Sequence, residues 1–173
     1  MIPSGGCWSA RPSCSLERLA AGEQPIGAVV LLGDEIIGRA YTQERTSGRR
    51  LVHADLLAMV QADEALGWRR RPHPVRLAVS LEPCVMCLGA AMAMRVDECC
   101  FALEPPSDGG AALAAAWRPS PDLPWFAPPK LFGGIRREES RSLFRRYRET
   151  APESGARRWA QSLLTVSSPA TGP

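Results

Sequence analysis

The sequence contains no apolar run of about 18 residues, the length that a membrane-spanning helix needs, so we expect no transmembrane segment. Its first residues, MIPSGGCWSARPSC, also lack an apolar stretch behind a basic start. We therefore expect no secretory signal and a cytoplasmic protein. Lysine is almost absent, with Lys130 as its single occurrence. The formal net charge of +3 is too small to require a nucleic-acid partner.

Length and composition instead indicate one ordinary globular domain. The 173 residues suffice to bury a sizeable core, and a hydrophobic content of 45% is typical of a folded protein. Residues 1–22, rich in Pro, Gly and Ser at their start, are predicted to form a leader with a short helix at 15–21. We expect the domain to span residues 23–150. A tail with a helix near 157–164 is expected over residues 151–173.

The spacing of apolar residues predicts strands that alternate with helices. The expected strands cover residues 26–32, 35–41, 75–81 and 98–103, and the expected helices cover residues 53–65, 84–93 and 135–148. The turn residues Gly33 and Asp34 make the first two strands a β-hairpin. Residues 43–50 are predicted to be a polar loop, and residues 104–129 a longer loop that covers a pocket. Such alternation is typical of a layered α/β domain.

The chain has six cysteines, at positions 7, 14, 84, 87, 99 and 100. In a cytoplasmic protein, cysteines are more often metal ligands or small core residues than disulfides. Cys99 and Cys100 lie in the apolar segment ECCFAL and are expected in the core. Only Cys84 and Cys87, in the segment PCVMC, have the spacing of metal ligands.

A histidine and a carboxylate accompany this cysteine pair. Two cysteines three positions apart at the start of a helix face the same way and can share one tetrahedral metal. His53, at the start of the preceding predicted helix, adds a nitrogen ligand, and Asp55 follows it in the segment HAD. Three protein ligands leave one position open, which is typical of a catalytic zinc. The motif of zinc nucleobase deaminases is H-x-E followed by P-C-x-x-C, and this chain matches it with Asp in place of Glu.

From about residue 23 to 148 the sequence resembles the tRNA adenosine deaminase branch of the cytidine-deaminase superfamily. The segments that carry the resemblance are QPIGAVV, EIIGRA, VHADLLAM, VSLEPCVMCLGA and RVDECCFAL. It implies a three-layer α/β/α fold with a mixed, about five-stranded sheet, usually assembled as a homodimer. It also implies one Zn²⁺ per chain on His53, Cys84 and Cys87, with Asp55 as the proton shuttle.

The resemblance further implies a reaction and a binding pocket. Zinc-activated water attacks the ring carbon that bears the amine, while Asp55 moves protons and ammonia leaves. Substrate contacts are expected from aliphatic strand residues, backbone groups near the metal and the residue after the second strand. These are Ile26, Ala28, Val29, Thr42, Ala54, Leu81 and Pro83. Apart from the resemblance, Trp125 and Phe126 in the predicted covering loop are candidates to stack on a flat base, or equally to cap the core of the domain.

Two residues depart from the pattern of that family. Asp55 stands where the family has Glu, which withdraws the carboxylate by about 1.5 Å. A misplacement of about 1 Å can lower a rate on the order of 10²-fold. Thr42 stands where the tRNA branch has an Asn, and a hydroxyl cannot make the bidentate contact of a carboxamide.

These departures leave three functions open. The first is a deaminase of free nucleosides or nucleobases, with a small molecule as substrate. The alternatives are a tRNA wobble adenosine deaminase, with tRNA as partner, and an inactive partner subunit in which zinc is structural. A run of arginines offers a path for a phosphate backbone, but interleaved glutamates make a solvated helix face the stronger interpretation. These arginines are Arg136, Arg137, Arg141, Arg145, Arg146 and Arg148.

Overall fold

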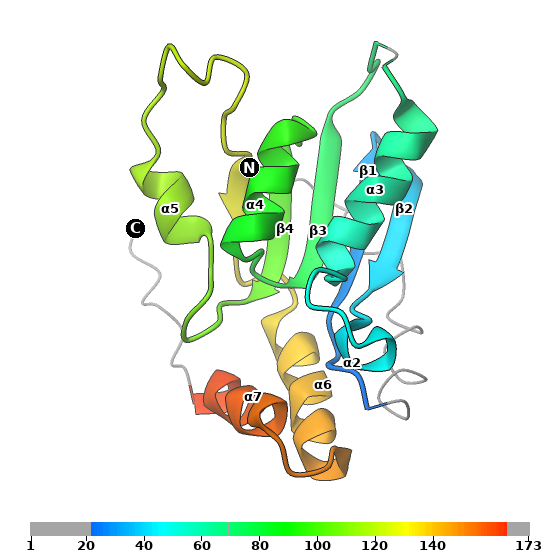
Figure 1. Cartoon of the computed structure of the whole chain (residues 1–173), viewed down its shortest axis with the longest axis vertical. Coiled ribbons are helices and arrows are strands. Elements are labelled where there is room, and N and C mark those ends of the chain that lie inside the picture. Colours follow the sequence, from blue (N-terminus) through cyan, green and yellow to red (C-terminus); the bar gives the residue numbers. More distant parts are fainter. Residues whose placement is uncertain (1–21, 69, 166–173) are drawn as a thin grey trace.

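A computed structural model describes residues 22–68 and 70–165 of the chain (Figure 1). The predicted leader, including its short helix at 15–21 and Cys7 and Cys14, lies outside the described residues apart from Gly22. Within the described ranges, no helix is long and apolar enough to cross a membrane.

Five strands form one mixed sheet. They are β1 (Gly27–Leu32), β2 (Glu35–Tyr41), β3 (Val75–Leu81), β4 (Glu98–Leu103) and β5 (Lys130–Phe132), in the order β2-β1-β3-β4-β5. β1 is antiparallel to both neighbours, whereas β3, β4 and β5 run parallel. The predicted α/β class and mixed five-stranded sheet are therefore confirmed. Only β5 was not predicted from the sequence, because a strand of three residues is too short to show an alternation of apolar and polar side chains.

Two helices lie side by side on one face of the sheet, α3 (Ala54–Leu66) and α4 (Val85–Ala93) (Figure 1). Alanines at the contact let α3 approach closely, since Ala54, Ala58 and Ala62 are fully buried. A glycine on β2 allows the same approach from the other side: a Cβ atom on Gly38 would lie 2.1 Å from the carbonyl oxygen of Ala58. The starts of both helices thereby reach the same end of the sheet.

The remaining helices include two that the sequence did not predict. α2 (Glu44–Ser47) and α5 (Ala111–Ala116) occur where loops were expected, and both are too short for a readable helical period. α6 (Arg137–Thr150) and α7 (Gly155–Thr165) form a pair beyond the carboxyl ends of β3 and β4 (Figure 1).

A second hydrophobic cluster joins α6 and α7 to the sheet. It consists of Leu81 and Leu103, which end β3 and β4, and of Phe144, Tyr147, Ala151, Ala160 and Leu163. The ring of Trp159 packs edge-to-face on Phe144 with centroids 6.2 Å apart. The segment predicted as a tail thus contributes, over its described part, a helix packed into the core.

Candidate active site

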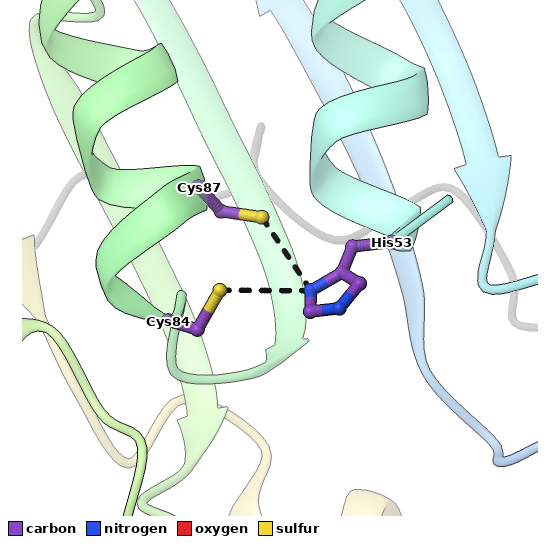
Figure 2. Close-up of side chains that lie close together, drawn as sticks. All are labelled: His53, Cys84 and Cys87. Atoms are coloured by element: carbon purple, nitrogen blue, oxygen red, sulfur yellow. Dashed lines mark hydrogen bonds between the residues drawn. The ribbon is translucent and has the colours of Figure 1, made fainter. Parts of the chain in front are cut away.

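The starts of α3 and α4 bring His53, Cys84 and Cys87 together (Figure 2). His53 and Cys84 each occupy the extended position just before their helix, and each carbonyl accepts the first helical hydrogen bond. Cys87 lies one turn into α4 and is fully buried. Figure 2 shows the imidazole and both sulfur atoms pointing toward one common space.

The spacing of these three side chains fits a tetrahedral zinc ion. Nδ1 of His53 lies 3.6 Å from Sγ of Cys84 and 3.7 Å from Sγ of Cys87. Zinc bonds of about 2.0 Å to nitrogen and about 2.3 Å to sulfur, at tetrahedral angles, place such atoms about 3.6 Å apart. The predicted ligand set can therefore hold zinc with little movement, and it leaves one coordination position for water or substrate.

The carboxylate of Asp55 lies beside this ligand set. It occupies the first turn of α3, where it is buried, and its Oδ1 accepts a hydrogen bond of 3.0 Å from the thiol of Cys87. Burial raises the pKa of Asp55 above its usual value, because the charged form loses water. A raised pKa makes the carboxylate a better proton acceptor, which suits a group that takes up and returns a proton.

In the metal-free protein, the ligands share protons as a coupled set. Hydrogen bonds from Cys87 and His53 lower the pKa of Cys84 to about 4. The hydrogen bond to Cys84 raises the pKa of His53 to about 9. Cys87 remains a thiol, because its hydrogen bond to Cys84 and its burial raise its pKa. Zinc binding therefore displaces protons from His53 and Cys87.

A cavity of about 490 Å³ opens onto the metal-binding side chains. Its described lining is Gln24, Ile26, Thr42, Glu44, His53, Asp55, Leu81, Glu82, Cys84, Pro105, Asp108, Gly155, Ala156 and Trp159. This volume lies in the range of ordinary small-molecule sites, about 300–1,000 Å³. Ile26, Leu81 and Trp159 supply apolar surface, and four carboxylates supply acceptors.

Three of the nine expected substrate contacts line this cavity, and six, including Trp125 and Phe126, do not. Ile26, Thr42 and Leu81 are lining residues. The other four, Ala28, Val29, Ala54 and Pro83, are absent from its described lining. Ala28 and Ala54 lie in the core between the sheet and α3. The carbonyl of Pro83 accepts a hydrogen bond of 2.8 Å from the amide of Gly110, so it anchors the loop before α5.

The structure places Trp125 and Phe126 outside this cavity, so their expected role at the substrate stays a prediction that the cavity does not support. Both residues line a separate hollow with Met94 and Arg95, and the guanidinium of Arg95 lies 5.3 Å from the ring centre of Trp125. The loop that carries Trp125 and Phe126 leads into β5, whose first residue pairs with Glu98 at the start of β4. Because the start of β4 follows the end of α4, the loop passes the end of α4 that is remote from Cys84.

Sequence reasoning missed several residues of the cavity. Burial raises the pKa of Glu82, whose carboxylate accepts a hydrogen bond of 2.7 Å from the amide of Ala111. This bond holds the loop that carries Asp108 against the site. Glu82 could have been found from the sequence, because it directly precedes Pro83 in the motif. Trp159 could not, because it lies more than 100 residues after His53 in the chain and no sequence pattern indicates that α7 brings it to the same cavity.

Comparisons with known proteins agree with this geometry. The zinc-binding region of cytidine and deoxycytidylate deaminases matches residues 10–103. A tRNA-specific adenosine deaminase from Bacillus subtilis is 43% identical over 89 residues, covering 51% of this chain and 54% of the relative. The chain thus spans about half the length of that relative.

Two solved structures share the fold at moderate identity. One comes from studies of A-to-I editing by tRNA:A34 deaminases, with a TM-score of 0.60 and 28% identity over 75% of this chain and 94% of that chain. The other is a variant of the protein NE0047 in complex with 8-azaguanine, with a TM-score of 0.59 and 26% identity over 79% and 82%. Fold, metal-binding side chains and sequence match agree: the chain belongs to the cytidine and deoxycytidylate deaminase zinc-binding family.

Proposed function

We propose that the protein is a zinc-dependent hydrolytic deaminase of a small amino-substituted nucleobase or nucleoside. The reaction replaces the ring amine by a carbonyl oxygen from water and releases ammonia. The observation that carries the choice of a small substrate is the charge of the cavity. Glu44, Asp55, Glu82 and Asp108 line it, and no lysine or arginine is among the described lining residues.

An acidic cavity disfavours a polyanionic substrate. Phosphate backbones are held by Lys and Arg, and carboxylates at the entrance repel them. Four of the six arginines in the run, Arg136, Arg137, Arg141 and Arg145, are in ion pairs with glutamates, which weakens the positive charge that the run offers to a phosphate backbone. This pairing supports the interpretation of that arginine run as a solvated helix face.

The residues of the cavity have separate tasks in this reaction. Bound zinc supplies the Lewis acid that makes water a nucleophile near neutral pH. The carboxylate of Asp55 would take one proton from the attacking water and deliver it to a ring nitrogen. It would then take the second proton, from the hydroxyl group now on the ring carbon, and pass it to the amine, which leaves as ammonia while the carbonyl forms. Ile26 and Leu81 exclude water from the flat ring. The indole of Trp159 adds apolar wall to the cavity, while its Nε1 is itself buried with no partner among the described residues.

Deamination of the wobble adenosine of tRNA is the second candidate. The names of the Bacillus relative and of the editing structure favour it as much as the 8-azaguanine complex favours a small base. Against it stands Thr42 at the position where the tRNA branch carries an Asn.

An inactive subunit with structural zinc is the third candidate, and measurable turnover alone would exclude it. The homodimer implied by the resemblance is part of the proposal and is tested by light scattering.

A substrate panel distinguishes these candidates. Ammonia release is measured with zinc-loaded protein on adenosine, guanosine, cytidine, their free bases, amino-substituted analogues and an anticodon stem-loop RNA. We expect turnover of a small compound, with a KM that changes little with salt. Turnover of the RNA alone, weakening steeply with salt, would overturn the proposal in favour of tRNA.

A further inference from the structure

A carboxylate from outside the ligand motif reaches the far side of the His53 ring. Glu44 begins α2, and its Oε1 lies 3.6 Å from Nε2 of His53. Its other oxygen, Oε2, accepts a hydrogen bond of 3.3 Å from the hydroxyl of Thr42. The side chains of Glu44 and His53 are each about one-third exposed, so the pair lies at the wall of the cavity rather than in the core.

The orientation of the imidazole decides where its proton must be. Nδ1 faces both sulfur atoms, so this nitrogen is the one that would bind zinc. A neutral imidazole whose Nδ1 binds a metal carries its hydrogen on Nε2, and Nε2 faces Glu44. The contact of 3.6 Å is an ion-pair distance, and a small side-chain rotation of Glu44 brings it to hydrogen-bond length.

Thr42 holds Glu44 on this side of the ring. The threonine is 1% exposed, and its amide donates to the carbonyl of Ile26 at 3.0 Å. Its hydroxyl faces two acceptors, the carboxylate of Glu44 and the carbonyl of Val52 at 3.5 Å. Val52 directly precedes His53, so one buried residue connects the backbone and the side-chain partner of the histidine.

We propose that Glu44, held by Thr42, is a positioning residue that fixes the ring and tautomer of His53 and thereby strengthens zinc binding. The proposal rests on the zinc site of the proposed function and adds a residue that the deaminase motif does not contain. Carboxylate partners of metal-bound histidines typically contribute about 10- to 100-fold in metal affinity. It also gives Thr42 a task other than reading the base.

Zinc affinity, measured by competition with a chelator of known affinity, tests this directly. The variants are Glu44→Ala, Glu44→Gln and Thr42→Val, with Asp108→Asn as the control. Asp108 also lines the cavity and has a positive φ of 75°, a conformation that Asn tolerates, and no contact with His53 is found for it in the described structure. We expect Glu44→Ala to weaken zinc binding about 10- to 100-fold. Smaller losses are expected for Glu44→Gln and Thr42→Val, and none for Asp108→Asn.

A second readout separates positioning from a general structural effect. In the zinc-loaded protein, the Nε2 hydrogen of His53 should exchange slowly with solvent by nitrogen-edited NMR, and Glu44→Ala should speed its exchange. Unchanged zinc affinity in Glu44→Ala, with only KM raised, would overturn the proposal and make Glu44 a substrate contact. Failure of the wild-type protein to bind zinc would instead refute the proposed function.

Discussion

The thiol of Cys87 donates a hydrogen bond of 3.0 Å to Oδ1 of Asp55. A side chain of the ligand set therefore touches the carboxylate that we propose as the proton shuttle. Asp55 is one methylene shorter than the Glu expected at this place, yet it lies directly against the sulfur of Cys87. The shorter side chain thus still contacts the ligand set.

Replacing Asp55 by Asn should separate chemistry from metal binding. The amide has the same shape and keeps an acceptor oxygen for Cys87, but it cannot carry a proton. We expect kcat to fall about 10²- to 10⁴-fold, the usual contribution of a general acid–base group. Zinc content by atomic absorption should remain at one ion per chain. Loss of zinc together with activity would make Asp55 a structural neighbour of the ligands instead of a shuttle.

The stability of the metal-free protein should depend on pH through Cys84 and His53. The lowered pKa of Cys84, about 4, means that native Cys84 binds fewer protons than the unfolded chain, so the free energy of unfolding rises with pH above that value. The raised pKa of His53, about 9, makes its stabilisation decline once pH exceeds the ordinary value of 6.5. The two contributions together should rise from about pH 4 to 6.5 and then level off until about pH 9.

Urea unfolding of the wild-type protein and of Cys84→Ser, both reduced and in chelator, isolates this effect. The difference between the two proteins cancels the opposite pH dependence of Glu82 and the part of that of Asp55 that comes from burial, because burial raises the pKa of both groups. A difference that stays constant between pH 4 and 6.5 would contradict the ion pair of thiolate and imidazolium.

Trp159 should contribute to substrate binding as an apolar wall of the cavity. Trp159→Phe keeps an aromatic ring against Phe144 but removes part of that wall. Loss of roughly 40 Å² of apolar contact costs about 1 kcal/mol, so we expect KM to rise roughly 5-fold with little change in kcat. Trp125→Phe is the matched control, because Trp125 lies at the separate hollow beside Arg95. Equal effects of both substitutions would argue against α7 as a wall of the substrate cavity.

Gly38 should be essential for the contact between β2 and α3. A Cβ atom there would meet the Ala58 carbonyl at 2.1 Å, so Gly38→Ala must push apart the strand and the helix that His53 precedes. Overpacking of this kind costs about 1–3 kcal/mol in the free energy of unfolding. Gly89 provides the control: it lies within α4 with nothing near its missing Cβ, and Gly89→Ala should stabilise by up to about 1 kcal/mol. Chemical denaturation measures both, and a neutral Gly38→Ala would contradict the close packing.

The elements that carry the metal ligands were predictable because their signals are local. Strands β1 to β4 and helices α3 and α4 begin and end within about one residue of the expected bounds. The spacing of Cys84 and Cys87 needs only the geometry of one helical turn to become a site. His53 could be predicted as the third ligand because the deaminase motif contains it. In the structure its Nδ1 lies within 3.7 Å of both sulfur atoms.

The cavity wall was harder to predict because it depends on contacts between distant segments. The position of Trp159 follows from the packing of α7 on Phe144, which no local pattern encodes. Trp125 and Phe126 had the right chemistry for stacking on a base, but the path of their loop is set by where β5 pairs. Glu44 was hidden in a segment that looked like a plain polar loop.

The proposed reaction is tested most directly by the rate at which zinc-loaded protein releases ammonia from free aminated bases and nucleosides. We expect zinc-dependent turnover of at least one small compound, reduced about 10²- to 10⁴-fold by Asp55→Asn. Deamination of an anticodon stem-loop RNA, with none of any small compound, would contradict it.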